Sequence, residues 1–405
     1  MYRIITASTD DLENPQGGID SLANAIAEQG GLLENSVAIV MCPLEYVNSG
    51  FCSLLYDRLD IPILGATTSL SSTDKEISPL ALSLFIISSD TLDIRVGLSD
   101  SLTIADGEED PLRVRYHAER VFNKLYNSLT VGLSKEPALV LPFMPVIYGY
   151  HDEGMAEAMF KAKKAPFFGA MPVDYFQPSR HFDPCVIFGN SYFEDRAALL
   201  VLDGEIKPKF FFQAMGRTNI ARQKAIITKS QGSIVYEVNG NPFKDFITSM
   251  GLVAKNIMVS LNTNPIIVYD PKLDKYSPRV ASKVLNDNGY VFNGPMPQGS
   301  TLSVRMIDEG EIFDSAKEVF SKVTKVPGAL GALFFSCYSR QLNLSYNEMN
   351  EIKLLSSTLE KENIPWLFAY SGGEFCPREE EDGTWKNRFL NLSAVAMVLQ
   401  EKDSA

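Results

Sequence analysis

Polar residues follow two apolar stretches near the C-terminal end of the chain, and their types suit the binding of a small molecule. An arginine can hold a carboxylate with two parallel hydrogen bonds, and a glutamate can accept from an amino group. Adjacent glycines can expose backbone N–H groups to an anion. Together these groups would suit an amino-acid-like zwitterion. The residues concerned are Cys337, Arg340, Tyr370, Gly372, Gly373 and Glu374.

Each of these residues also has a structural interpretation. Buried free cysteines are common, which favours Cys337 as a packed thiol. Arg340 could equally lie on the surface. The two glycines could form a tight turn beside a solvated glutamate. Tyr370 could pack with its hydroxyl at the rim of a pocket.

The elements around these residues are predicted as strand, helix, strand and a further strand. The helix would begin with a capping box from Ser345 to Glu348 and bury a stripe of apolar residues at helical spacing. The polar residues would then lie where two strands end, the edge at which open α/β sheets place ligands. The stretches are 332–337, 345–359, 364–370 and 387–399, and the stripe is Met349, Ile352, Leu355 and Leu359.

The same pattern occurs twice earlier in the chain, which indicates one architectural unit used three times. In all three copies the second strand is entered through a proline, at 62, 166 and 365, and glycine follows at 65, 169 and 372–373. The turn Asp203-Gly204 predicts a hairpin into residues 209–213. The first copy comprises strands at 36–42, 60–67, 80–87 and 93–98 with a helix at 45–58, and the second comprises strands at 137–142, 165–174, 185–188 and 197–202 with a helix at 153–164.

A different segment separates the second and third copies. Residues 225–240 predict a hairpin with Gln231-Gly232 at its turn, and residues 243–250 predict a helix. Residues 262–297 are rich in Pro, Asn, Asp and Tyr, which indicates long loops with short strands. A strand at 301–307 and a helix at 310–322 follow.

These elements predict a mixed α/β (α+β) fold. The repeated β-α-β-β units would form two mixed sheets packed face to face with the helices outside, because each unit buries its helix on one sheet face. The length of 405 residues favours two parts. The predicted division gives halves at 1–200 and 201–405.

Composition excludes several classes of partner. The net charge of −13 opposes binding to nucleic acid and to anionic membranes. The N-terminus lacks a signal-peptide core, and the apolar stretches are too short to span a bilayer. Five cysteines without a CxxC pair favour reduced thiols and the cytoplasm.

No catalytic residues, metal ligands or cofactor are assigned. His117, His151 and His181 form no metal-binding motif, and no nucleotide-binding or hydrolase signature is present. The acidic run 379–382 is interpreted as a solvated loop. An enzyme with Cys337 as nucleophile remains an alternative, although it would need a base that the neighbouring sequence does not supply.

The chain resembles the FIST family, a sensory ligand-binding module of signalling proteins. The resemblance is carried in the first half by Pro62 to Gly65 and Pro166 to Ala170, and at the junction by residues 198–204 and 236–242. Its most specific part is the ordered set Ser336, Cys337, Arg340, Glu348, Tyr370, Ser371, Gly372, Gly373, Glu374, Pro377 and Asn391.

What the resemblance implies is a binding role. It implies a small, amino-acid-like ligand, adds Asn391 to the ligand-binding residues and suggests a separate signalling protein as partner, because the chain leaves no room for an output domain. Leu390 stands where the family usually has histidine, which puts a haem-based gas sensor in doubt. A protein-binding scaffold is a further alternative.

Overall fold

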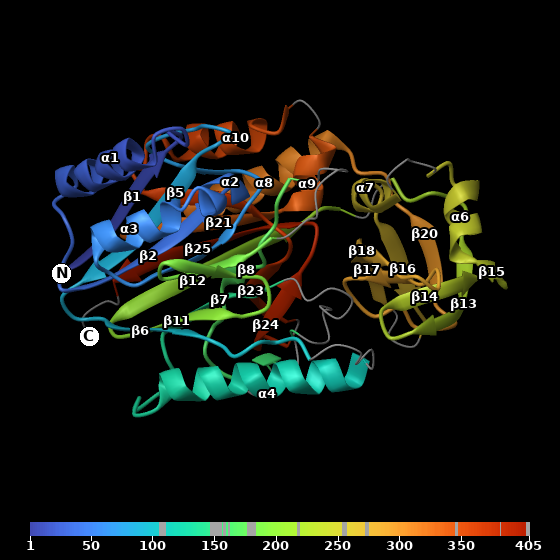
Figure 1. The fold of residues 1–405 in the computed structure, drawn as a ribbon. Helices are drawn as coiled ribbons and strands as arrows, with labels where there is room; N and C mark the ends of the chain where they lie inside the picture. Colours follow the sequence, from blue (N-terminus) through green and yellow to red (C-terminus); the bar gives the residue numbers. More distant parts are fainter. Residues whose placement is uncertain are drawn as a thin grey trace.

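The computed structural model describes residues 1–401 except 105–110, 146–155, 157–158, 161–162, 176–183, 217–218, 253–256, 272–274, 345–346 and 381. It confirms the mixed α/β class. The arrangement differs from the predicted pair of sheets, because three mixed sheets surround one core and a fourth sheet lies beside them (Figure 1).

The first repeat, residues 2–89, builds most of the first sheet. The sheet order is β1-β5-β2-β3-β9-β10, and β2 and β3 are its parallel pair. Helices α1 to α3 cover its outer face, where their apolar side chains are buried. The elements of the repeat are β1 (Tyr2–Thr9), α1 (Pro15–Glu28), β2 (Asn35–Cys42), α2 (Leu44–Asn48), α3 (Phe51–Leu59), β3 (Ile63–Thr67), β4 (Ser71–Thr73) and β5 (Leu82–Ser89).

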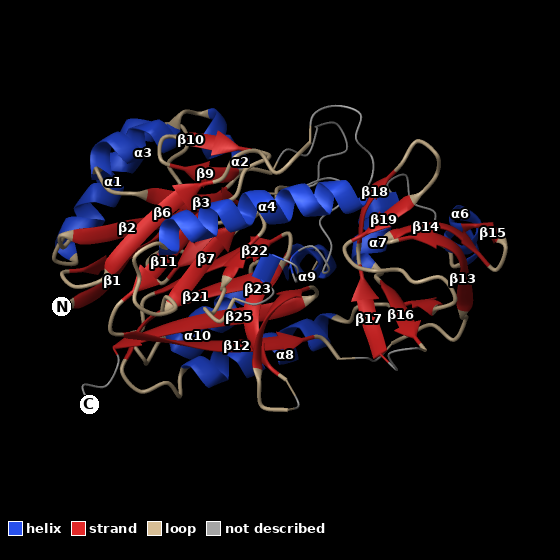
Figure 2. Cartoon of the chain, turned by 90° about the horizontal axis from the view of Figure 1, so that it is seen from below, coloured by secondary structure: helices blue, strands red, loops and turns tan. Residues whose placement is uncertain are grey.

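The second repeat, residues 93–203, builds most of the second sheet, whose order is β24-β23-β8-β7-β11-β6. The strand at 93–98, predicted to end the first copy, belongs here instead, because it pairs with β11. Helix α4 lies along its outer face (Figure 2). Most of the helix predicted at 153–164 lies outside the described residues; Ala156, Met159 and Phe160 are helical and buried. The elements are β6 (Asp93–Leu98), α4 (Pro111–Thr130), β7 (Leu139–Phe143), β8 (Gly169–Ala170), β9 (Val186–Phe188), β10 (Ser191–Phe193) and β11 (Ala198–Asp203).

The third repeat, residues 206–401, builds most of the third sheet, whose order is β12-β25-β21-β22-β4. Helices α8 and α10 cover its outer face. The elements are β12 (Ile206–Ala214), α8 (Glu309–Val323), β21 (Ala329–Cys337), α9 (Tyr338–Asn343), α10 (Asn350–Leu359), β22 (Trp366–Ser371), β23 (Glu374–Glu379), β24 (Trp385–Leu390) and β25 (Ser393–Glu401).

Each repeat gives strands to the next sheet. The second repeat supplies β9 and β10 to the first sheet, where β9 pairs with β3. The third repeat supplies β23 and β24 to the second sheet, where β23 pairs with β8. The first repeat supplies β4 to the third sheet, where it pairs with β22. The exchange therefore closes a ring, and the division at residue 200 stays a prediction because strands pair across it.

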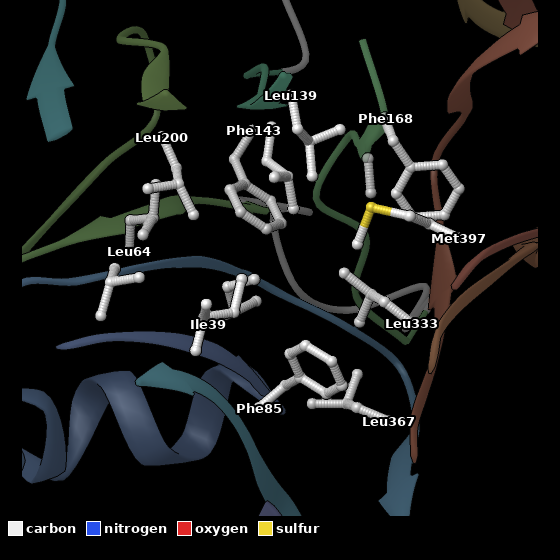
Figure 3. Packing of buried hydrophobic residues seen from close by; sticks show 14 of the residues in the cluster. Ile39, Leu64, Phe85, Leu139, Phe143, Phe168, Leu200, Leu333, Leu367 and Met397 are labelled. Carbon is white, nitrogen blue, oxygen red and sulfur yellow. The ribbon is translucent and has the colours of Figure 1, made fainter. Parts of the chain in front are cut away.

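The inner faces of the three sheets share one apolar core. Figure 3 shows side chains from all three, such as Phe85, Phe143 and Leu333, packed together in its interior. Burying an apolar side chain of this size stabilises a fold by about 1.5–3 kcal/mol. Each sheet is thus apolar on both faces, with helices outside and the shared core inside.

An insertion within the third repeat, residues 225–304, forms its own sheet at one end of the molecule (Figure 1). It has a separate apolar core. The predicted hairpin, helix and short strands are confirmed. The elements are β13 (Ala225–Gln231), β14 (Ile234–Val238), β15 (Asn241–Pro242), α6 (Phe243–Ser249), α7 (Ile257–Thr263), β16 (Ile266–Asp270), β17 (Lys275–Arg279), β18 (Ala281–Val284), β19 (Tyr290–Phe292) and β20 (Thr301–Val304).

Several local predictions were wrong. The helix at 45–58 is two helices, because Gly50 adopts a φ of 78° and interrupts it. The turn at Asp203 and Gly204 makes no hairpin: β11 pairs with β6 and β7, whereas β12 pairs with β25. The last strand is also two, β24 and β25, separated near Leu392, whose φ is 54°.

The glycine after each early proline lies within a strand rather than after it. A Cβ at Gly65 would lie 1.8 Å from the Val40 carbonyl oxygen, and one at Gly169 would lie 2.0 Å from that of Pro142. Both glycines therefore allow a close approach between parallel strands.

We expect Gly65→Ala to lower the free energy of unfolding by about 3 kcal/mol, the upper part of the range for overpacked cores. Chemical denaturation measures the loss. Gly216→Ala is the control, since Gly216 is exposed with no atom within 4 Å of an added Cβ. Equal stability of the two variants would contradict this packing.

Candidate functional site

The inner face of the third sheet ends in a polar row, which is called the polar end of the core. In the third sheet, Cys337, Ser371 and Ser393 continue the inner face two residues beyond Phe335, Ala369 and Val395. Phe335, Ala369 and Val395 share their row with Phe143, Ala170 and Ala198 of the second sheet and with Met41, Ala66 and Ser83 of the first. Six residues after the proline of each repeat, the residue equivalent to Ser371 is Pro172 in the second repeat and Thr68 in the first.

Glu374 is the acidic side chain at this polar end. It opens β23 beside Ala170 of the second sheet and reaches across to the third. Ser371 Oγ donates to its Oε1 and Ser393 Oγ donates to its Oε2, both at 2.7 Å. The side chain is fully buried. Burial raises the pKa of this carboxyl to about 8, although both serine hydroxyls lower it. Glu374 is therefore mostly protonated at neutral pH.

Cys337 lies next to this carboxyl but is unsuited to nucleophilic chemistry. Burial, followed by the neighbouring Glu374, raises the pKa of its thiol to about 12. A nucleophilic cysteine needs a lowered pKa and a base within reach. The thiol instead packs in a small apolar cluster with Val280 of the insertion and Leu392.

Arg340 lies on the opposite face of the third sheet in a buried polar network, although its Nε has no hydrogen-bond partner among the described residues. Helix α9 places it so that Nη2 is 2.7 Å from Glu351 Oε1. It also donates to Ser315 Oγ at 2.8 Å and to the Ile312 carbonyl at 3.0 Å. Arg340 and Glu351 are both 0% exposed. The alternative of a surface arginine is therefore wrong.

Tyr370 belongs to the Arg340 network and not to the Glu374 end. Its hydroxyl donates to Glu351 Oε2 at 3.0 Å, and Ser336 Oγ donates to the same carboxylate. Tyr370 packs among the outer-face residues, whereas Ser371, one residue later, points inward to Glu374. The structure thus places Arg340 and Glu374 on opposite faces and does not bring them together around one ligand.

The two glycines are explained by contacts within the protein. The Gly372 N–H donates to the Met171 carbonyl, so it is not available to an anion. A Cβ at Gly372 would lie 2.7 Å from the Pro172 carbonyl oxygen, and one at Gly373 would lie 2.4 Å from the Phe389 ring. Neither glycine has a positive φ. Gly372 therefore allows close packing against the second repeat, and Gly373 allows close packing against Phe389 of the third repeat.

Asn391 lies at the contact between the third sheet and the insertion. Its Oδ1 accepts from Asn293 Nδ2. A second contact joins Ser339 Oγ to Asn262 Oδ1 at 3.3 Å. Because Leu392 packs with Cys337, this contact adjoins the polar end of the core.

Sequence reasoning assigned no contact role to several residues, although Ser336 and Ser371 were part of the ordered set that carries the family resemblance. Ser371 and Ser393 hold Glu374, Ser336 and Glu351 hold the Arg340 network, and Gln341 Oε1 accepts from Ser69 of the first repeat. The Gln341 Nε2 forms no hydrogen bond of standard geometry within the described residues, although Tyr175 of the second repeat lies beside it. The sequence signal for Glu351 was its place directly before Ile352, a residue of the predicted buried stripe.

The three histidines show no shared site within the described part of the chain. His117 Nε2 lies 3.0 Å from the Ser101 carbonyl oxygen. His151 and His181 lie outside the described residues, as do Ser345 of the predicted capping box and Glu381. Helix α10 begins at Asn350, and Ile352, Leu355 and Leu359 of the predicted stripe are buried. No described group of three or more His, Cys, Asp or Glu side chains could hold a metal ion.

Comparisons with known proteins identify domains along most of the chain. A family model described as the FIST N domain matches residues 36–241, and one described as the FIST C domain matches residues 244–377. A search of curated proteins gave no match. No helix in the described residues is both long and apolar enough to cross a membrane.

Likeness to solved structures is weak. Cyanuric acid hydrolase from A. caulinodans shares 8% identity over 100% of both chains, with a TM-score of 0.36. PurL from T. maritima complexed with ADP shares 12% identity over 98% of this chain and 71% of that one, with a TM-score of 0.21. At these TM-scores neither likeness supports a statement about this chain.

We expect Arg340→Ala to lower the free energy of unfolding by about 3–5 kcal/mol, because it leaves Glu351 as an uncompensated buried charge. Urea denaturation measures the loss. Lys322→Ala is the control, since its pair with Glu318 is exposed and such pairs contribute about 0.3–0.5 kcal/mol. A loss no larger than that of the control would show that the Arg340 network is not a buried ion pair.

We expect Glu374→Gln to gain stability relative to wild type as pH rises from 5 to 8. Above its ordinary pKa of 4.5 the carboxyl ionises in the unfolded chain, whereas in the folded protein it keeps its proton up to about 8. Wild type therefore loses up to about 1.4 kcal/mol per pH unit across this window, and the glutamine variant does not. Urea denaturation at four pH values measures the difference. Glu379→Gln, at the exposed end of β23, should follow wild type; parallel profiles for all three proteins would refute the buried acid.

Proposed function

Because this chain belongs to the FIST family, whose domains are sensory and bind small ligands, we propose that it is a ligand-binding signalling protein with its site at the polar end of the shared core. The observation that carries this proposal is Glu374. It is a fully buried carboxyl that hydrogen-bonds to two serines and, within the described residues, to no cation. Burying an acid in this way is costly unless a partner compensates it.

The ligand class that fits best carries a protonated amine, as an amino acid or a similar metabolite does. An ammonium group could pair with ionised Glu374, which would give up its proton on binding. Cys337, Ser371 and Ser393 would surround that group. Below a pH of about 8 the apparent affinity for the ligand would then rise with pH, because removing the proton from Glu374 costs less free energy as the pH approaches its pKa.

The ligand's hydrogen-bond acceptor, such as the carboxylate of an amino acid, would need a donor from the protein. Arg340 cannot serve, because it is paired with Glu351. The amide of Gln341 is the available candidate. Two contacts place Gln341 near Ser371. Gln341 Oε1 accepts from Ser69, and the preceding residue, Thr68, donates through Oγ1 to the Tyr370 carbonyl, next to Ser371. Arg340 and Tyr370 would support the site from behind the sheet rather than touch the ligand. Asn391, with Gly372 and Gly373, would line its boundary towards the insertion and the second repeat.

A separate signalling protein would receive the message, and the cytoplasm would be the location. All five cysteines are free, which fits a reducing compartment. Cys337 would serve the binding site by packing, because its raised pKa disfavours the alternative of a nucleophilic enzyme.

We expect amino acids, screened by thermal shift and measured by calorimetry, to include a ligand whose hydroxy-acid analogue binds at least tenfold more weakly, since it lacks the ammonium group. Glu374→Gln should weaken binding by at least as much. In buffers of different ionisation enthalpy, binding at pH 7 should release close to one proton.

The exposed Glu379→Gln variant is the matched control and should bind as wild type does. Equal affinity of wild type and Glu374→Gln, or of the amine and its hydroxy analogue, would contradict the assigned role of Glu374.

A further inference from the structure

Three of the five cysteines gather on the outer face of the first sheet, away from Glu374. Cys42 ends β2, Cys52 is the second residue of α3, and Cys185 directly precedes β9. All three are buried in the apolar cluster between this sheet and its helices. The chain separates Cys185 from the other two by more than a repeat, so the fold and not the local sequence brings them together.

Backbone pairing fixes two of these thiols in one row. Cys42 pairs in register with Thr67 on the neighbouring strand β3. Thr67 in turn bonds to Cys185 on its other side: its N–H donates to the Cys185 carbonyl, and Cys185 N–H donates to Thr67 Oγ1, both at 2.9 Å. Residues in one row across neighbouring strands point to the same face of a sheet. Cys42 and Cys185 therefore both face the helices, and both are buried in the cluster on that side.

Cys52 faces this row from α3. The thiols of Cys42 and Cys52 are neighbours in this cluster, and Cys185 is close enough to interact electrostatically with both. Two neighbouring cysteines can form a disulfide when their backbones allow the S–S geometry. The nine residues between Cys42 and Cys52 hold α2 and the Gly50 bend, so the pair closes a small loop.

The thiols are electrostatically unequal. The neighbouring Cys42 thiol lowers the pKa of Cys52, against the opposing effect of burial. The position of Cys52 in the first turn of a helix adds a positive partial charge that favours a thiolate. The neighbouring Cys52 thiol, followed by burial, raises the pKa of Cys42, and burial raises that of Cys185. This is the asymmetry of an attacking sulfur beside a thiol that keeps its proton.

We propose that Cys52 and Cys42 form a redox-active pair that a peroxide converts to a disulfide. The Cys52 thiolate attacks one peroxide oxygen, the O–O bond breaks and, with one proton taken up, water leaves from hydrogen peroxide while Cys52 becomes a sulfenic acid. The Cys42 sulfur then attacks the Cys52 sulfur, its proton leaves with the hydroxyl as a second water, and the disulfide forms. In total two thiols are oxidised and one peroxide is reduced to two waters.

The competing interpretation is that all buried cysteines are equally inert packing groups. Cys337 and Cys376 serve as internal references, because both are buried and have a raised pKa, and neither has a thiol among the groups that raise it. Packing alone would leave Cys52 no more reactive than these two. The proposed pair would oxidise first.

The test treats the intact, reduced protein with hydrogen peroxide, alkylates the remaining thiols under denaturing conditions and maps them by mass spectrometry. We expect two thiols per chain to be lost as a Cys42–Cys52 disulfide at least tenfold faster than Cys337 or Cys376 reacts, with recovery by dithiothreitol. Cys52→Ser should abolish this loss, and Cys337→Ser should retain it.

Oxidation of Cys52 no faster than that of the two references would overturn the proposal, as would a Cys52–Cys185 bond or a disulfide that forms only in urea. Rates on the wild-type chain decide these outcomes even if Cys52→Ser fails to fold. The result is independent of ligand binding at Glu374, because no ligand is added.

Discussion

The structure depends on the burial of both faces of three sheets. Each sheet has an outer face covered by helices and an inner face that can be buried only against the other two. No single repeat can provide that inner environment for itself. The exchanged strands β4, β9 and β23 reinforce this dependence, because each completes a sheet to which its own repeat does not otherwise belong. The shared core and the ring of exchanged strands therefore impose the same requirement: all three repeats must be folded together.

The repeats differ at the polar end of the core. Six residues after the proline of each repeat, the first has Thr68, the second has Pro172 and the third has Ser371. The third repeat also carries Glu351 and Glu374, the two described carboxylates that are 0% exposed. Glu351 is matched by an arginine and has three partners, whereas Glu374 hydrogen-bonds only to two serines among the described residues. The paired Glu351 is suited to stabilising the fold, whereas Glu374, which has no cationic partner in the described part of the chain, is suited to binding a ligand. The proposed site therefore lies on the inner face, where Glu374 is.

Much of the fold could be predicted from local signals in the sequence. Strand β2, helix α8 and the thrice-used unit follow from periodicity and from prolines at equivalent places. Strand exchange could not be predicted, because a short polar strand such as Ser71–Thr73 carries no mark of a partner nearly three hundred residues away. The hairpin expected after Asp203 failed for the same reason: a turn sequence fixes a bend but not the strand that pairs beyond it. Glu374 was identified because it follows a strand. Its partner Ser371 appeared only within the ordered set of the family resemblance, and Ser393 was not identified, because serine is too common to indicate a role. The pairing of Arg340 with Glu351 joins two elements and is settled only by their packing.

The exchange of strands has a consequence for biosynthesis. Asp74, beside β4, bonds to Trp366, which leaves the ribosome 292 residues later. Until then the edge that β4 will complete does not exist, and the first sheet also lacks β9 and β10 while the second repeat is unfinished. The nascent chain must therefore hold open sheet edges for most of its translation, when a neighbouring copy on the same messenger could supply the missing strand instead. The three residues of β4 are all polar, and the strand is short. Before β22 is made, β4 therefore offers little apolar surface to which a strand of another copy could bind.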